Sequence, residues 1–217
     1  MKNKNELLKI YIPIAIFGFL CLTSIGLTNV AGFSLTILFS ILYLFIENKR
    51  NKGEMEDIGF MPKNFLSDIK KYWWLILIPV VLGIVSISLF KFVLPEVYLY
   101  ALDTKPMLSF GKLFLQIPQL LILAFAQEIA FRGFLQTKLC NITKPIWAII
   151  ITSLFFAIGN FPAGSISGLI YISFFIFIDN IIYGVIYQRT KNIYSCTISH
   201  FLANVIGTFI LFFYLFD

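Results

Sequence analysis

Long apolar runs, separated by short polar connections, follow one another along the 217-residue chain. A helix that spans a membrane needs about 20 mostly apolar residues. The runs predict seven spans, near residues 10–29, 31–46, 74–95, 110–136, 146–161, 166–187 and 193–216. Six or eight spans stay open, because the turn at 29–31 is very tight and the sixth run could break at Asp179-Asn180. The predicted fold class is all-α, a polytopic membrane helix bundle.

The composition favours the same class. Hydrophobic residues make up 59% of the chain and charged residues only 13%, whereas about 25% is typical of a soluble domain. No hydrophilic block is large enough to fold alone, so we expect one integral domain. The cysteines Cys21, Cys140 and Cys196 are odd in number and scattered. They predict neither a disulfide framework nor a metal site, and we expect no cofactor.

The net charge of +6 does not indicate a nucleic-acid partner. The Lys and Arg residues fall in alternate connections, where they set orientation and contact lipid headgroups. Their alternation predicts a cytoplasmic N-terminus and places Asp217 outside. We expect a multi-pass protein of the cell membrane, and the Lys-, Asn-, Ile- and Phe-rich composition favours a bacterial plasma membrane. The first apolar run exceeds the usual 7–15 residues of a signal peptide, which favours an uncleaved anchor.

The connection at 47–72 is the largest polar piece. Its end, FLSDIKKYWWLILI, predicts a surface helix that continues into a span, with Trp73 and Trp74 at the headgroup level. We expect this segment to anchor the chain and to carry no chemistry.

The stretch AFAQEIAFRGF, residues 124–134, places two charges inside an apolar run. An unpaired charge at the bilayer centre costs roughly 2.5–3.5 kcal/mol on insertion scales. Glu128 and Arg132 are four residues apart, so they share a helix face and can form a buried ion pair. Gln127 lies about 100° around the helix, on a face shared with Gln116. An unpaired amide in lipid is costly, so we expect this face to point into the bundle.

Three more polar clusters lie in or at the ends of later runs. His200 is the single histidine of the chain, and Asn204 follows one turn later on the same face. Histidine within a span usually points inward, and a structural role is a reasonable alternative to a chemical one. Asn160 ends the fifth run before a Pro-Gly stretch, where a simple turn is common. Asp179 is either an interior polar residue or a kink point.

Together these clusters resemble the family of CAAX prenyl proteases and bacteriocin-processing or self-immunity proteins, known as CPBP or Abi-type. These proteins are glutamate-dependent intramembrane proteases. The resemblance covers roughly residues 108–207, which implies a membrane core at 108–217 that follows N-terminal helices and a cytoplasmic connection at 1–107. Glu-Glu-x-x-x-Arg-Gly appears as QEIAFRG (127–133), Phe-x-x-x-His as FAIGN (156–160), and His-x-x-x-Asn as HFLAN (200–204).

The departures from the family pattern bear on activity. The resemblance implies that Glu128 and Arg132 form the structural pair and that His200 and Asn204 stabilise an oxyanion or orient the substrate. Gln127 stands where the family has its general base, and Asn160 stands where it has a histidine. Amides cannot accept a proton from water near neutral pH. The six positions therefore predict a catalytic site whose two proton-transfer groups are missing.

We favour a catalytically impaired member that binds a peptide, a lipidated peptide or a partner membrane protein in a cytoplasm-facing polar cavity, in self-immunity, assembly or regulation. One alternative is an active endopeptidase in which Glu128 changes role and His200 is its proton partner. Another is an unrelated small transporter or channel whose path is lined by Glu128, Arg132, Asp179 and His200. Residue counts from the basic boundaries put Gln127 and His200 at similar depths but Asn160 deeper, so the place of Asn160 stays open.

Overall fold

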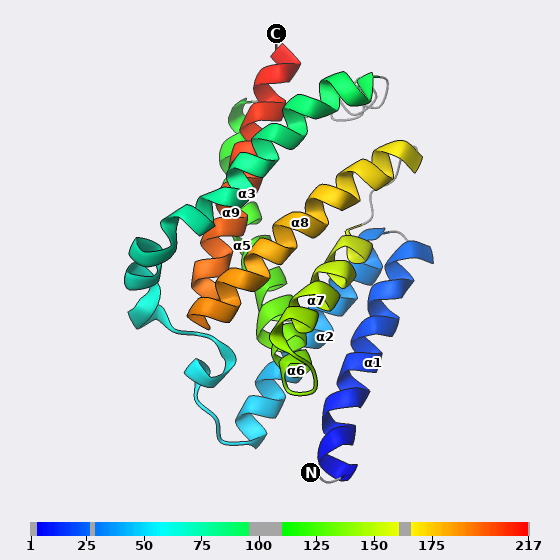
Figure 1. Ribbon diagram of the computed structural model, residues 1–217, viewed down its shortest axis with the longest axis vertical. Coiled ribbons are helices and arrows are strands. Elements are labelled where there is room, and N and C mark those ends of the chain that lie inside the picture. Colours follow the sequence, from blue (N-terminus) through cyan, green and yellow to red (C-terminus); the bar gives the residue numbers. More distant parts are fainter. Residues whose placement is uncertain (1–3, 27–28, 96–109, 161–165, 217) are drawn as a thin grey trace.

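The computed structural model describes residues 4–26, 29–95, 110–160 and 166–216 (Figure 1). The part of the chain that it describes is helical, without strands. The long helices are α1 (Lys4–Gly26), α2 (Asn29–Arg50), α3 (Phe65–Val93), α5 (Phe110–Glu128), α7 (Pro145–Gly159), α8 (Ile166–Thr190) and α9 (Ile193–Phe216), and the short elements are η1 (Met55–Ile58), η2 (Pro62–Asn64), the π-helix η3 (Ile129–Gln136) and α6 (Thr137–Cys140).

These helices confirm the predicted all-α bundle. Each of the seven predicted spans corresponds to one helical segment, with α5, η3 and α6 forming the fourth. Within the described ranges, five segments are long and apolar enough to cross a membrane, and two shorter apolar helices cover 7–23 and 145–159. Helix α8 runs without interruption through Asp179 and Asn180, so a break at this point does not add an eighth span.

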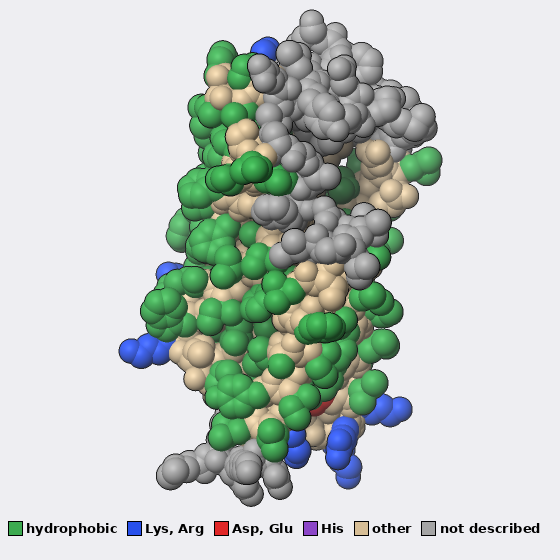
Figure 2. Space-filling model, turned by 90° about the vertical axis from the view of Figure 1, so that its right-hand side faces the viewer, with side chains coloured by type: hydrophobic (Ala, Val, Ile, Leu, Met, Phe, Trp, Pro, Cys, Tyr) green, Lys and Arg blue, Asp and Glu red, His purple; other side chains and the backbone are tan. Residues whose placement is uncertain are grey.

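The π-helix η3 lies at the centre of the bundle. All of its residues are buried, and it packs against α2, α7, α8 and α9. Gly133 allows this packing, because a Cβ atom there would lie 3.1 Å from Ile193 Cδ1 and 3.4 Å from the Ile58 carbonyl oxygen. Large apolar side chains instead cover the outer faces of the bundle (Figure 2). A charge on η3 is therefore enclosed by protein and must find its partners there.

The basic connections gather at one end of the bundle. The start of α1, the end of α2 and the α6–α7 turn lie in the lower part of Figure 1, and the α8–α9 turn lies higher, beside the α2–α3 connection. Lys and Arg side chains lie mainly toward this end on the face that Figure 2 shows. The arrangement is the one that the charge alternation predicts, and the cellular side of this end stays a prediction.

The connection between α2 and α3 does more than anchor the chain. Helix α3 is kinked at Tyr72, which separates its polar first turns from its apolar length as the sequence predicts. The connection also docks on the α8–α9 turn: Ile193 N–H donates to the Gly59 carbonyl at 2.8 Å, and the Asn192 amide donates to Asp68 at 2.8 Å. Ser195 donates to the same carboxylate at 3.2 Å. Sequence patterning missed these bonds, because their partners are more than 120 residues apart.

Candidate functional site

Glu128 and Arg132 form the predicted ion pair. Glu128 ends α5 and Arg132 lies one turn later in η3, and Nε of the arginine is 3.1 Å from Oε2 of the glutamate. Both side chains are 0% exposed. Each charge therefore offsets the desolvation of the other, as the spacing predicts.

A second anchor, which sequence patterning did not predict, holds the arginine. Arg132 Nη2 donates to the Asn180 backbone oxygen at 3.0 Å and to its Oδ1 at 2.8 Å. Asn180 Nδ2 in turn donates to the Ile176 carbonyl at 3.0 Å. The guanidinium carbon lies 5.6 Å from the ring centroid of Phe156 and 5.5 Å from that of Tyr183, within cation–π range. Arg132 thus joins η3, α7 and α8.

His200 completes this buried cluster. Its Nδ1 is 2.8 Å from Glu128 Oε1, across a sequence separation of 72 residues. The imidazole stacks on the Tyr183 ring at 4.8 Å and meets the edge of Phe156 at 5.8 Å. Glu128 therefore holds Arg132 with one oxygen and His200 with the other. The ring orientation of His200 is fixed by both the carboxylate and the stacking.

A cavity of about 320 Å³ opens beside this cluster. Its polar lining comes from four helices and consists of Gln127, Asn160, Asp179, Asn180, His200, Asn204 and Thr208. Four of the six residues singled out in the sequence, Gln127, Asn160, His200 and Asn204, thus face one space. Glu128 and Arg132 are not in the lining and lie behind it. The chemical roles of all six residues stay a prediction.

Asn160 lies in the cavity although residue counting placed it too deep. It caps α7, and its Nδ2 donates to the Phe156 carbonyl at 3.0 Å. Counting residues from a boundary assumes that every helix runs along the membrane normal. A tilted helix advances less along the normal per residue, so counting overestimates the depth of its residues. By contrast, Gln116 is half-buried but is not among the cavity-lining residues. The polar face expected from Gln116 to Gln127 reaches the cavity through Gln127 alone.

The lining is polar rather than metal-binding in character. Among the residues that the structure describes, no three His, Cys, Asp or Glu side chains gather where they could hold a metal ion. Amide, hydroxyl and carboxylate groups that converge beside a fixed imidazole can bind and orient a polar ligand. Apolar Leu120, Leu123 and Ile176 complete the lining.

Comparison with family models matches residues 109–206 to the family described as Rce1-like, type II CAAX prenyl endopeptidase Rce1-like. This segment is Rce1-like. The match confirms the resemblance to CAAX proteases. It covers α5 to the first part of α9, which supplies every cavity-lining residue named above except Thr208. Neither the curated proteins nor the solved structures contain a match. The match and the long apolar helices support an integral membrane protein that is similar to CAAX proteases over residues 109–206.

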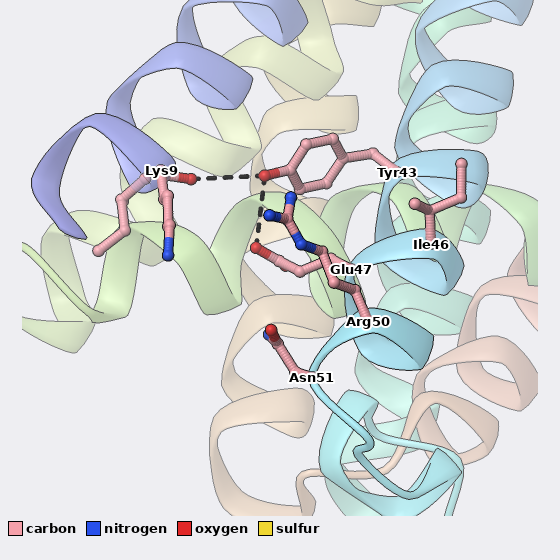
Figure 3. Close-up of a pocket in the computed structure, with 7 residues that line it drawn as sticks. Lys9, Tyr43, Ile46, Glu47, Arg50 and Asn51 are labelled. Carbon is pink, nitrogen blue, oxygen red and sulfur yellow. Dashed lines mark hydrogen bonds between the residues drawn. The ribbon is translucent and has the colours of Figure 1, made fainter. Parts of the chain in front are cut away.

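A second pocket of about 450 Å³ lies at the polar end, outside the Rce1-like segment (Figure 3). The Tyr43 hydroxyl lies between the Lys9 carbonyl oxygen at 3.5 Å and Glu47 Oε1 at 3.3 Å. Arg50 and Asn51 line the same pocket. Glu47 also binds Lys138 of the Rce1-like segment, which ties α2 to α6. This contact connects the two parts of the chain at the polar end.

Proposed function

We propose that this CAAX protease-like protein binds a peptide segment in the cavity of its Rce1-like segment and has lost most of its peptidase activity. The observation that carries the proposal is the lining itself. Gln127 and Asn160 face the cavity where the family has its glutamate base and its histidine, while Glu128 is fully enclosed behind it. Loss of a general base typically lowers a rate by roughly 10² to 10⁴.

The groups that shape the pocket remain in place. His200 lines the cavity with its ring fixed by Glu128 and Tyr183, and Asn204 lines the same space. Such preorganised polar groups bind a polar ligand without the cost of ordering it on arrival. With the basic end of the bundle in the cytoplasm, the bound segment would be a peptide, a lipidated peptide or part of a membrane protein, and the role would be self-immunity, assembly or regulation.

A matched pair of proteins tests the proposal. Binding and cleavage of a fluorescent farnesylated peptide with a CAAX terminus are measured with purified wild type and with the double variant Gln127→Glu, Asn160→His. We expect wild type to bind the peptide without cleaving it, and the double variant to gain cleavage, because a carboxylate desolvated in such a cavity can act as a base near neutral pH. Absence of binding by wild type would contradict the proposed function.

A retained peptidase activity is the second candidate, and the contact between Glu128 and His200 favours it. A carboxylate 2.8 Å from Nδ1 fixes the imidazole in one tautomer, so that Nε2 would take the proton from an attacking water, as in other carboxylate–histidine pairs. In the same assay, wild-type cleavage that disappears in His200→Asn, with folding retained, would establish this candidate. The transporter alternative gains no support, because Glu128 and Arg132 pair with one another outside the cavity lining.

A further inference from the structure

Asp179 is the acidic residue that lines the cavity in the part of the chain that the structure describes. The sequence analysis offered two interpretations of Asp179, a kink point or an interior polar residue. Helix α8 is unbroken at this residue, which excludes the kink. Its Oδ1 is enclosed and accepts no hydrogen bond from any described group. An enclosed carboxylate oxygen without a partner is costly. The cavity therefore favours a ligand that brings a donor to this point.

Asp179 takes part in none of the ion pairs that link described residues. The ion pairs among the described residues link Lys63 with Glu56, Arg132 with Glu128, Lys138 with Glu47, and His200 with Glu128. The nearby arginine is ion-paired with Glu128 and donates to Asn180 through Nη2, while its Nη1 is buried without a hydrogen-bond partner among the described groups. The charges of Glu128 and Arg132 offset each other, which leaves the cavity with the uncompensated carboxylate of Asp179.

Two other side chains of the lining also present acceptor oxygens. Asn160 Nδ2 donates one of its two N–H groups to the Phe156 carbonyl, and its Oδ1 is an acceptor. The Thr208 hydroxyl donates to the Asn204 carbonyl at 2.8 Å, which leaves its lone pairs. A lysine ammonium group has three donors and no acceptor. It fits a cavity that presents a carboxylate and further acceptor oxygens better than an anionic group does.

We propose that the cavity selects peptides by a lysine side chain, whose ammonium group binds Asp179 with Asn160 and Thr208 as further acceptors. This inference rests on the proposed function and specifies the ligand for the same cavity. The volume of about 320 Å³ is at the lower end of the range for ligand pockets, so it holds one side chain rather than a folded partner. The apolar part of the lining, Leu120, Leu123 and Ile176, would contact the methylene stem.

The test compares farnesylated CAAX peptides in which a single lysine is moved along the chain, each paired with its acetyllysine form. Acetylation removes the charge and keeps the stem. Binding is measured in a neutral detergent without lipid, so that aminolipids do not compete. For at least one lysine position, wild type should bind the lysine peptide at least about tenfold more tightly than the acetyllysine peptide.

Asp179→Asn should abolish this difference and leave the affinity for the acetyllysine peptide unchanged. Glu56→Gln, which removes a half-exposed carboxylate of the Lys63 pair far from the cavity, should preserve it. Equal binding of both peptides by wild type at every position would overturn the lysine preference and leave the proposed function standing. A lysine preference that persists in Asp179→Asn would overturn the role of Asp179 and also leave the proposed function standing. Failure of wild type to bind any peptide would overturn both. If Asp179→Asn does not fold, the wild-type peptide pairs decide alone.

Discussion

Two glutamate–cation pairs lie toward the two ends of η3, and they differ in burial and in the groups that surround them. Glu128 and Arg132 are both 0% exposed, and the structure adds His200, Asn180 and two aromatic rings around them. Lys138 and Glu47 are 10% and 25% exposed and lie beside open pockets at the polar end. The inner pair can rely only on protein groups, whereas water and ions reach the outer one. A carboxylate paired with a cation therefore holds His200 of the cavity lining at one end and ties two helices together at the other.

The largest expected effect comes from the inner pair. Glu128→Gln leaves the Arg132 guanidinium buried without a counter-charge, which costs about 3–5 kcal/mol of unfolding free energy. The adjacent Gln127→Ala is the matched control, because it changes the same helical turn without removing an ion pair. Thermal unfolding in detergent should show a much lower midpoint for Glu128→Gln. Equal midpoints would contradict the comparison between the two pairs.

Asn180→Ala should have an intermediate effect. It removes the 2.8 Å acceptor of Arg132 Nη2, and a hydrogen bond to a charged group contributes about 1.5–3 kcal/mol. The backbone oxygen of residue 180 still accepts from the arginine, so the loss is partial. Asn204→Ala, on the neighbouring helix α9, is the control and should change the unfolding midpoint less. A larger loss in the control would show that Asn180 does not anchor the arginine.

Removal of the outer pair should cause the smallest loss of unfolding free energy of the three pairs and bonds compared. Its loss should be the only one that depends on salt concentration. Lys138→Met removes a partly exposed ion pair but keeps an apolar stem, so we expect a loss of about 1 kcal/mol or less. Added salt should shrink this loss, because mobile ions screen exposed charges. The loss from Glu128→Gln should not respond to salt. As a control, Lys63→Met at an exposed pair 3.9 Å apart should leave the unfolding midpoint unchanged.

The sequence alone predicts the helices well and the site in part. Apolar runs bounded by charges place α8 at 166–187 against the observed 166–190, because burial in lipid imposes a length on each run. The pairing of Glu128 and Arg132 also follows from spacing within one helix. Contacts inside one element are thus readable from periodicity.

Contacts between elements are not readable in this way. The binding of Glu128 to His200 and the anchoring of Arg132 by Asn180 depend on how η3, α8 and α9 pack. The π-helix itself changes the angle between successive side chains relative to the α-helix that periodicity assumes. Family resemblance brought His200 into the site, whereas Asp179, which lines the same cavity, entered only as an interior polar residue and in the transporter alternative.

The docking of the α2–α3 connection on the α8–α9 turn also constrains the order of biosynthesis. Asp68 and Gly59 are made early, but their partners Asn192 and Ile193 follow 124 and 134 residues later. At 5–20 residues per second, this delay is roughly 6–27 s. Throughout that interval the α2–α3 connection lacks the α8–α9 turn on which it docks. Glu128 likewise lacks its partner until His200 has been made. Helix α9 and the turn before it therefore complete both contacts, and a ribosome that stops before residue 192 leaves Asp68 without Asn192 and Glu128 without His200.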